Sequence, residues 1–366
     1  MPNSKQLIIL IHGMGDHTGS SFRKEVVSAC NNSLSRYKSY QNTQFENEVY
    51  IESIGYNHIF EKMREEYKNS ALDLDVFIKG KLGSAEIPSV VNELVSLQQD
   101  LGKDKFQYTH VLDVIFYLTL LGEKVRLYVA EELLTAMLKY HDKGVRVNVL
   151  AHSLGTAVIH DTLNKLYFDG YKDKTGKIKL DPNTLSIDML WMFANVSPVI
   201  TRLSGLTQPL KSAVKPGPGG CIGSLRNVFH RFDPFTLKFI NRFDPSLADN
   251  WIEPFFFKNH YQRYKTEKVA RMNTHGIGGY VDPSKSEVGG YLEDSLVCHD
   301  FLRSLFEFIP DEQEKMTGDK AFKHLVGEAR EIQEFISELE NSEASDFKKL
   351  IKMLIAFKAY LQDIDF

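Results

Sequence analysis

Ser153 lies in the part of the chain that points most directly to chemistry. The segment 151–155, AHSLG, fits the nucleophile-elbow pattern G-x-S-x-G with alanine in place of the first glycine. A strand-like run at 145–150 precedes the serine, and a helix-like stretch at 156–166 follows it. Small residues at 151 and 155 suit a strained turn that brings a strand and a helix close together. This context predicts Ser153 as a nucleophile.

The turn after the first apolar run supplies a second feature. Residues 7–11, LIILI, suit a buried parallel strand, and His12 and Gly13 follow directly. In enzymes with a nucleophile elbow of this kind, a loop after an early strand contributes one donor of an oxyanion hole, and the residue after the nucleophile contributes the other. We therefore predict that the backbone amides of Met14 and Leu154 form the hole. His12 is a candidate for lining the pocket, and bracing of the turn by hydrogen bonds is favoured over direct chemistry for it.

A serine at such an elbow is followed along the chain by an acid and then by a histidine. Asp233 follows a strand candidate at 225–230 and precedes a proline, so it is preferred over Asp244 as the acid. The later histidines are His260, His275, His299 and His324. His275 is the predicted base because its glycine-rich loop directly follows a strand candidate at 269–272.

Three further histidines have less defined roles. His152 is next to the nucleophile and His230 is near the acid, so each either lines the pocket or has a structural role. The helical spacing of 296–306 gives His299 a packing role.

The surrounding elements alternate between strands and helices. Further strand candidates are 48–54 and 185–194. The alternation predicts an α/β protein with a doubly wound, mostly parallel sheet. A mostly helical stretch at 56–140 is interpreted as an insertion, or lid, over the carboxyl ends of the strands. Residues 214–223, VKPGPGGCIG, indicate a mobile loop.

The chain divides at about residue 310. Residues 1–309 are predicted to form the catalytic domain, and 310–366 a C-terminal helical extension. Two amphipathic helices are expected there. Docking on the body is favoured for them, and oligomerisation or partner binding is the alternative.

Composition narrows the class of protein. With 43% hydrophobic and 25% charged residues, the 366-residue chain has a globular profile, and its net charge of −4 argues against nucleic acid as a partner. Three widely spaced cysteines match neither a disulfide framework nor a zinc site. The polar start lacks the layout of a secretory signal, and no apolar run is long enough to span a bilayer. A cytoplasmic protein without a cofactor is expected.

Four segments in order resemble the DDHD-type and related lipase-like branches of the α/β-hydrolase superfamily. They are HGMGDH at 12–17, DVIFY at 113–117, AHSLG at 151–155 and NVFHRFDP at 227–234. The resemblance implies an α/β-hydrolase fold and hydrolysis of carboxylic esters in lipid-like substrates, including phospholipids. In this chain the aromatic segment expected after the histidine is reduced to Tyr280 and Tyr291, and the C-terminal helices match nothing in the family. The branch is also associated with acidic metal ligands, but no metal is predicted from Asp113 and Asp233.

The expected activity is that of a serine esterase or lipase acting through an acyl-enzyme on Ser153, with Asp233 and His275 completing the triad. An acyltransferase or a thioesterase would use the same residues. An inactive, hydrolase-like interaction scaffold is the alternative from another class. Apolar stretches at 114–121 and 251–257 suit core packing, an acyl-chain site or transient contact with a membrane surface.

Overall fold

The structure is a computed structural model. It describes residues 5–13, 18–66, 113–114, 116–173, 176–181, 183, 185–197, 200, 212–217, 219–230, 233, 261–266, 276–278 and 290–323. Within these ranges lie the strands β1 (Leu7–Ile11), β2 (Tyr50–Ile54), β3 (Val147–His152), β4 (Tyr171–Asp173), β5 (Gly176–Ile178), β6 (Ile187–Phe193), β7 (Ile222–His230) and β8 (Tyr261–Thr266). The helices are α1 (Gly19–Ser35), α2 (Phe45–Glu48), α3 (Asn57–Glu66), α7 (Gly122–His141), α8 (Leu154–Phe168), α12 (Ser295–Leu305) and α13 (Glu312–Lys323), with 3-10 turns η1 (Lys38–Tyr40) and η5 (Tyr291–Glu293) and a π-helical turn η2 (Tyr117–Leu121).

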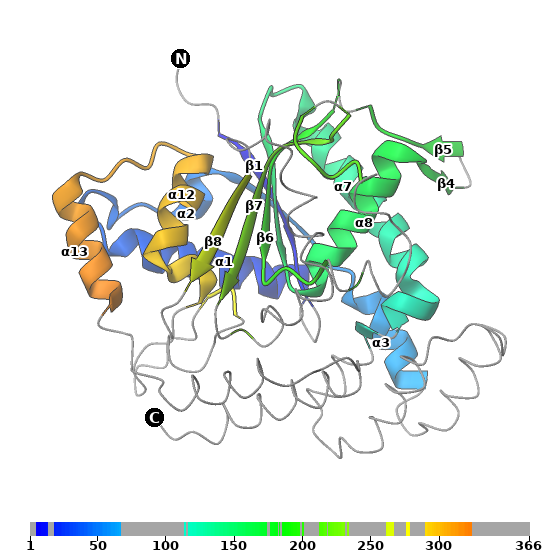
Figure 1. Cartoon of the computed structure of the whole chain (residues 1–366), viewed down its shortest axis with the longest axis horizontal. Helices are drawn as coiled ribbons and strands as arrows, with labels where there is room; N and C mark the ends of the chain where they lie inside the picture. The colour runs from blue at the N-terminus through cyan, green and yellow to red at the C-terminus, as the bar shows by residue number, and fades with distance from the viewer. Residues whose placement is uncertain are drawn as a thin grey trace.

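A parallel sheet forms the centre of the molecule. Among the described residues, six strands follow the order β2-β1-β3-β6-β7-β8, and every neighbouring pair is parallel (Figure 1). The chain runs from β1 outward to β2 and then returns past β1 to β3, so the direction of winding reverses between β1 and β3. The predicted α/β architecture with a parallel sheet is confirmed.

Both faces of the sheet are covered, which explains why β1 is apolar throughout. Leu7, Ile9 and Ile11 pack on one face into a core shared with α7 and α8. Ile8 and Leu10 pack on the other face, together with α1 and α12. All of these side chains are fully buried, and a strand buried on both faces needs a continuous apolar run. Figure 1 shows α7 and α8 on one side of the sheet and α12 on the other.

The prediction of a helical insertion over 56–140 is wrong in its C-terminal part. α7 covers the sheet, because Val125, Val129 and Leu133 are fully buried in the core that also contains one face of β1. α7 directly precedes β3 and is therefore a crossover helix between parallel strands. An amphipathic pattern is the same for a crossover helix and a lid, so periodicity could not separate them. Residues 67–112 lie outside the described residues, and a lid there stays a prediction.

The observed strands refine the predicted boundaries. β2, β3, β6 and β7 correspond to the four runs predicted at 48–54, 145–150, 185–194 and 225–230. β7 begins at Ile222, so the predicted mobile loop at 214–223 is wrong for its last two residues. β8 was not predicted, because its sequence YQRYKT has little apolar character. The strand predicted at 269–272 lies outside the described residues.

The first helix of the predicted extension at 310–366 packs on the body. Gly318 of α13 lies against the ring of Tyr37, where a Cβ atom would come within 2.7 Å of a ring carbon. The backbone N–H of Ser39 donates to Glu314 Oε1 at 2.6 Å. α13 precedes the two amphipathic helices expected in the extension. Residues 324–366 lie outside the described residues, so the docking of those helices stays a prediction.

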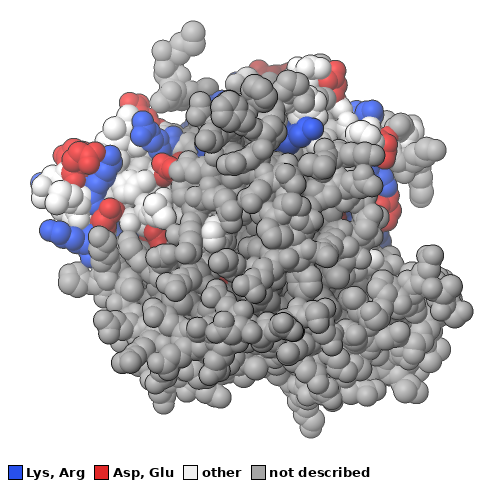
Figure 2. Space-filling model, viewed as in Figure 1, with Lys and Arg blue, Asp and Glu red and all other residues white. Residues whose placement is uncertain are grey.

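The described surface is mixed in charge. Figure 2 shows Lys and Arg side chains interspersed with Asp and Glu on the described parts of one face, in keeping with the small net charge of −4. No helix in the described part of the chain is long and apolar enough to cross a bilayer.

The three cysteines of the chain are free thiols inside the protein. Burial raises the pKa of Cys30 well above its ordinary value, that of Cys221 to about 12 and that of Cys298 to about 11. Because the thiolate is the reactive form, buried and protonated thiols are inert.

We therefore predict that the folded protein resists alkylation by iodoacetamide at about pH 8, whereas all three cysteines react in concentrated guanidinium chloride. Peptide mass spectrometry after timed quenching measures both reactions. Alkylation of Cys30 or Cys298 in the folded protein, at the rate of a free cysteine peptide, would contradict the packing of α1 against α12.

Candidate active site

The turn between β3 and α8 holds Ser153 in a strained backbone conformation. Its φ of 52° and ψ of −128° lie in a region that costs a non-glycine residue about 1–3 kcal/mol. Its N–H donates to the carbonyl of Phe193 in β6 at 3.0 Å. Its carbonyl accepts from the Thr156 N–H at 2.9 Å and from the Thr156 hydroxyl at 2.6 Å. The strand, sharp turn and helix predicted around Ser153 are present, and three hydrogen bonds hold the turn.

The turn after β1 packs directly against this elbow. A Cβ atom on Gly13 would lie 2.7 Å from Ser153 Cβ and 3.4 Å from Ser153 Oγ. A Cβ atom on Gly155 would overlap the carbonyl oxygen of His12 and lie 2.8 Å from that of Ile11. Both positions therefore require glycine. The small residue predicted at 155 is needed, but its close neighbour is the end of β1 rather than β3.

His12 braces this turn. Its Nδ1 lies 2.6 Å from the Gly13 carbonyl oxygen, and its Nε2 accepts from the Tyr56 N–H at 3.2 Å. A carbonyl only accepts and a backbone N–H only donates, so these contacts fix the neutral tautomer with its proton on Nδ1. His12 is fully buried, and the geometry supports the bracing role that the sequence favoured.

Tyr56 completes the brace, and sequence reasoning missed it. Its ring stacks on that of His12 with 4.4 Å between centroids, and its hydroxyl donates to the His12 carbonyl at 2.8 Å. Burial, together with the charge of Asp113, raises the pKa of Tyr56 well above its ordinary value, so the hydroxyl remains a donor. The segment after β2 thus fixes the turn after β1.

One of the two predicted oxyanion donors directly follows the predicted nucleophile in the chain. Leu154 is the first residue of α8 and is fully buried. Its N–H has no acceptor within the helix, and the positive end of the helix dipole favours negative charge there. Met14, the other predicted donor, lies outside the described residues, but the preceding Gly13 packs against Ser153.

Asp233 is fully buried near the carboxyl end of β7. Its N–H donates to the carbonyl of His230 at 3.1 Å. Its Oδ2 accepts a hydrogen bond of 2.6 Å from the hydroxyl of Tyr291. Sequence reasoning did not identify Tyr291 as a partner of the predicted acid, because the two residues lie 58 positions apart.

The predicted base, His275, lies outside the described residues, as do the alternatives His260 and His324 and the alternative acid Asp244. The residue after His275 is described: the carbonyl of Gly276 accepts from the Tyr291 N–H at 3.0 Å. The chain next to the predicted base is therefore tied to the tyrosine that binds the predicted acid.

Two histidines, one next to the predicted nucleophile and one near the predicted acid, are both mostly buried. His152 stacks on Phe22 of α1, with 6.1 Å between ring centroids. The ring of His230 meets Tyr291 edge-on at 6.3 Å, and the His230 N–H donates to the Tyr291 hydroxyl at 2.9 Å. Both rings pack against aromatic neighbours, and their role in lining a pocket stays a prediction.

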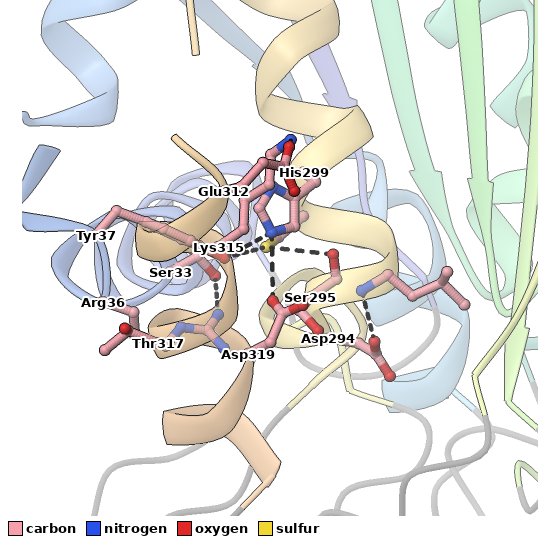
Figure 3. Close-up of polar contacts among 12 residues, drawn as sticks. Ser33, Arg36, Tyr37, Asp294, Ser295, His299, Glu312, Lys315, Thr317 and Asp319 are labelled. Carbon is pink, nitrogen blue, oxygen red and sulfur yellow. Dashed lines mark hydrogen bonds and ion pairs between the residues drawn. The ribbon is translucent and has the colours of Figure 1, made fainter. Parts of the chain in front are cut away.

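His299 belongs to a different cluster (Figure 3). Its Nε2 lies 3.0 Å from the Tyr37 hydroxyl and 3.4 Å from Asp319 Oδ1. Tyr37 lies just after α1 and Asp319 lies in α13, so His299 joins these segments to α12. The packing role predicted from helical spacing agrees with these contacts.

A second serine, histidine and aspartate arrangement lies within the α8 layer, and sequence reasoning missed it. His160 Nδ1 lies 3.1 Å from Asp161 Oδ1, and His160 Nε2 lies 3.0 Å from Ser212 Oγ. Tyr117 of η2 donates to Asp161 Oδ2 at 2.9 Å, and the Val214 N–H donates to Ser212 Oγ at 3.1 Å. The buried network ties two segments to α8. Its sequence signal is an adjacent histidine and aspartate within a mostly apolar helix.

No group of three or more His, Cys, Asp or Glu side chains suited to a metal ion occurs in the described part of the chain. Asp113 and Asp233 are the two acidic residues named above in connection with metal ligands. Asp113 is buried near Tyr56, at the β1 turn, whereas Asp233 lies near the end of β7.

Replacing Gly155 with alanine tests the contact between α8 and β1. Alanine normally stabilises a helix by about 1 kcal/mol relative to glycine. Here we predict destabilisation by about 3 kcal/mol, because the added methyl group meets backbone atoms that cannot move aside. Gly144→Ala is the control, since its φ is 62° but nothing lies within 4 Å, and it should cost about 1 kcal/mol. Urea unfolding measures both, and equal losses would contradict the contact.

Replacing Thr156 with valine tests the support of the elbow. The change keeps the shape but removes the hydroxyl's bond to the Ser153 carbonyl. It also leaves the Val196 N–H, which donates to Thr156 Oγ1 at 3.0 Å, without that acceptor. We predict a loss of about 1–3 kcal/mol in the free energy of unfolding. Thr135→Val, at an exposed hydroxyl of α7, should change stability by less than about 0.5 kcal/mol. Similar losses in the two variants would count against the role of Thr156.

Comparisons with protein-family models, with curated proteins and with solved structures found no match to this chain. The likeness to lipase-like hydrolases therefore rests on the sequence segments themselves. Support for a function comes from those segments and from the geometry around Ser153.

Proposed function

We propose that this protein is a serine hydrolase of the α/β-hydrolase fold that cleaves carboxylic esters of lipid-like substrates. The observation that carries the proposal is Ser153 itself. It occupies a strained turn with φ of 52° between a buried parallel strand and a helix, and its Oγ is buried without a hydrogen-bond partner among the described residues. Strained residues of this kind cluster at active sites.

The position of Ser153 in the sheet supports the proposal. In open parallel sheets, ligands bind beyond the carboxyl ends of the strands, where the direction of winding reverses. Here that reversal lies between β1 and β3. Gly13 follows β1, Ser153 follows β3, and the two residues pack against each other at this point.

The order of candidate residues along the chain also fits. In this fold the serine follows one strand, the acid follows a later strand and the histidine follows last. Ser153 follows β3, Asp233 comes after β7, and His275 comes after β8. The hydrogen bonds from Tyr291 to Asp233 and to the Gly276 carbonyl favour pairing of the acid with the base.

The proposed mechanism uses these residues in two half-reactions. His275 accepts the Ser153 hydroxyl proton as Oγ attacks the ester carbonyl carbon, and Asp233 orients and stabilises the imidazolium. The amides of Leu154 and Met14 bind the oxyanion. As the carbon–oxygen bond to the leaving alcohol breaks, His275 gives the alcohol its proton and an acyl-enzyme remains. Water then attacks the acyl carbon, transfers a proton through His275 to Ser153 and releases the acid.

The substrate class is taken from the resemblance to lipase-like sequences. The same acyl-enzyme would transfer its acyl group to an alcohol in an acyltransferase, or form from an acyl-thioester in a thioesterase. Product analysis with added alcohols and with acyl-thioesters distinguishes these reactions from ester hydrolysis.

A fluorophosphonate probe tests the nucleophile. We predict that the purified wild-type protein is labelled on the peptide containing Ser153, and that Ser153→Ala abolishes labelling. His275→Ala should slow labelling by at least about a thousandfold, because the serine loses its base.

Ser212→Ala is the matched control, since Ser212 is also buried next to a histidine–aspartate pair and should not be the labelled residue. Loss of labelling in Ser212→Ala alone would indicate that Ser212, in the α8 network, is the nucleophile. Absence of labelling in the folded wild type would support the inactive-scaffold alternative.

A further inference from the structure

Tyr291 is buried at the start of η5, close to the carboxyl end of β7, with 3% of its surface exposed. We propose that Tyr291 is a positioning residue for catalysis, which holds the carboxylate of Asp233 in the orientation that the base requires. This inference rests on the proposed function of the Ser153 site.

The direction of the hydrogen bonds supports this role. The Tyr291 hydroxyl accepts from the His230 N–H at 2.9 Å and lies 2.6 Å from Asp233 Oδ2. A backbone N–H can only donate, and a phenol has one proton to give. The tyrosine proton is therefore directed at Asp233 Oδ2. His230, at the end of β7, fixes the hydroxyl, and the hydroxyl fixes the acid.

The backbone of Tyr291 holds the segment that carries the predicted base. Its N–H donates to the Gly276 carbonyl, and the Leu292 N–H donates to the Ile277 carbonyl, each at 3.0 Å. A Cβ atom on Gly290 would lie 2.5 Å from Gly278 N. The two segments are thus in close backbone contact, one residue beyond His275.

The ring of Tyr291 reaches the third segment of the site. It meets Phe193 edge-on, with 6.0 Å between centroids, and the Phe193 carbonyl accepts the Ser153 N–H. One side chain therefore contacts the strand that supports the nucleophile and binds the acid, while its backbone binds the chain next to the base.

The turn that carries Tyr291 is itself fixed on α1. The Ser33 hydroxyl donates to the Leu292 carbonyl at 3.0 Å, and the Asn32 side-chain amide donates to Glu293 Oε1 at 3.1 Å. The Gly290 N–H donates to Glu293 Oε2 at 2.8 Å. The two bonds from α1 anchor the turn to a helix that packs on the sheet, and the third closes the turn itself.

The test compares wild type with Tyr291→Phe, which keeps the ring and removes only the hydroxyl. The readouts are the rate of fluorophosphonate labelling of Ser153 and kcat/KM for p-nitrophenyl butyrate, each measured from about pH 5 to pH 9. We expect both rates to fall by about 10- to 100-fold with little change in KM, because the acid loses its orienting bond.

The pH profile distinguishes a positioning role from a merely structural one, because the loss of a merely structural contact would not shift it. Without the tyrosine bond, the Asp233 carboxylate is held less well toward the base and stabilises the imidazolium less. The acid limb of both profiles should therefore move to lower pH, by about half a unit to one unit. In an Asp233→Asn background, Tyr291→Phe should change the labelling rate by less than about twofold, because its effect passes through the carboxylate.

Tyr37→Phe is the matched control, since it removes a buried hydroxyl that contacts His299 on another part of the protein, and it should leave both profiles unchanged. An unshifted profile in Tyr291→Phe, or an equal loss in the Asp233→Asn background, would overturn the positioning role while Ser153 remains labelled. If wild-type Ser153 is not labelled at all, the proposed function fails, and this inference fails with it.

Discussion

The tight contact between the end of β1 and the first turn of α8 sets the position of everything else at the site. Gly155 has no space for a side chain against the carbonyls of Ile11 and His12, and Gly13 has none against Ser153. Because β1 and β3 are neighbours in the sheet, the helix after β3 must pass over the end of β1. The predicted nucleophile and the start of the predicted oxyanion loop are therefore brought together by backbone packing.

This packing also explains how the fold tolerates a strained serine. The N–H and the carbonyl of Ser153 are both hydrogen-bonded, to Phe193 and Thr156 respectively. Ala194, directly after β6, is the other described non-glycine residue with positive φ, at 49°. Its N–H is bonded to the carbonyl of Val228 in β7 at 2.9 Å. Such conformations persist only where surrounding contacts hold the backbone in place. Here neighbouring strands and a helix supply those contacts.

Sequence reasoning predicted the features that depend on local pattern and missed those that depend on distant contacts. The apolar β1 and the small residues around Ser153 are visible in the chain itself, so the elbow could be predicted. The periodicity of α7 shows that one face is buried but not what buries it, so it does not distinguish a crossover helix from an insertion. Tyr56 and Tyr291 reach the site from distant segments, and no spacing rule connects either tyrosine with its partners.

The two buried serines show why the identity of neighbouring residues does not by itself define a nucleophile. Ser212 contacts His160, which in turn contacts Asp161. The Ser212 Oγ, however, already accepts the Val214 N–H and lies against α8. Ser153 follows a strand at the point where the winding of the sheet reverses, and its Oγ has no partner among the described residues. Attack on a carbonyl needs an oxygen lone pair that can be directed at the substrate and a helix end that favours the resulting charge. Ser153 meets the second condition through α8, whereas Ser212 is bound into a network that joins structural elements.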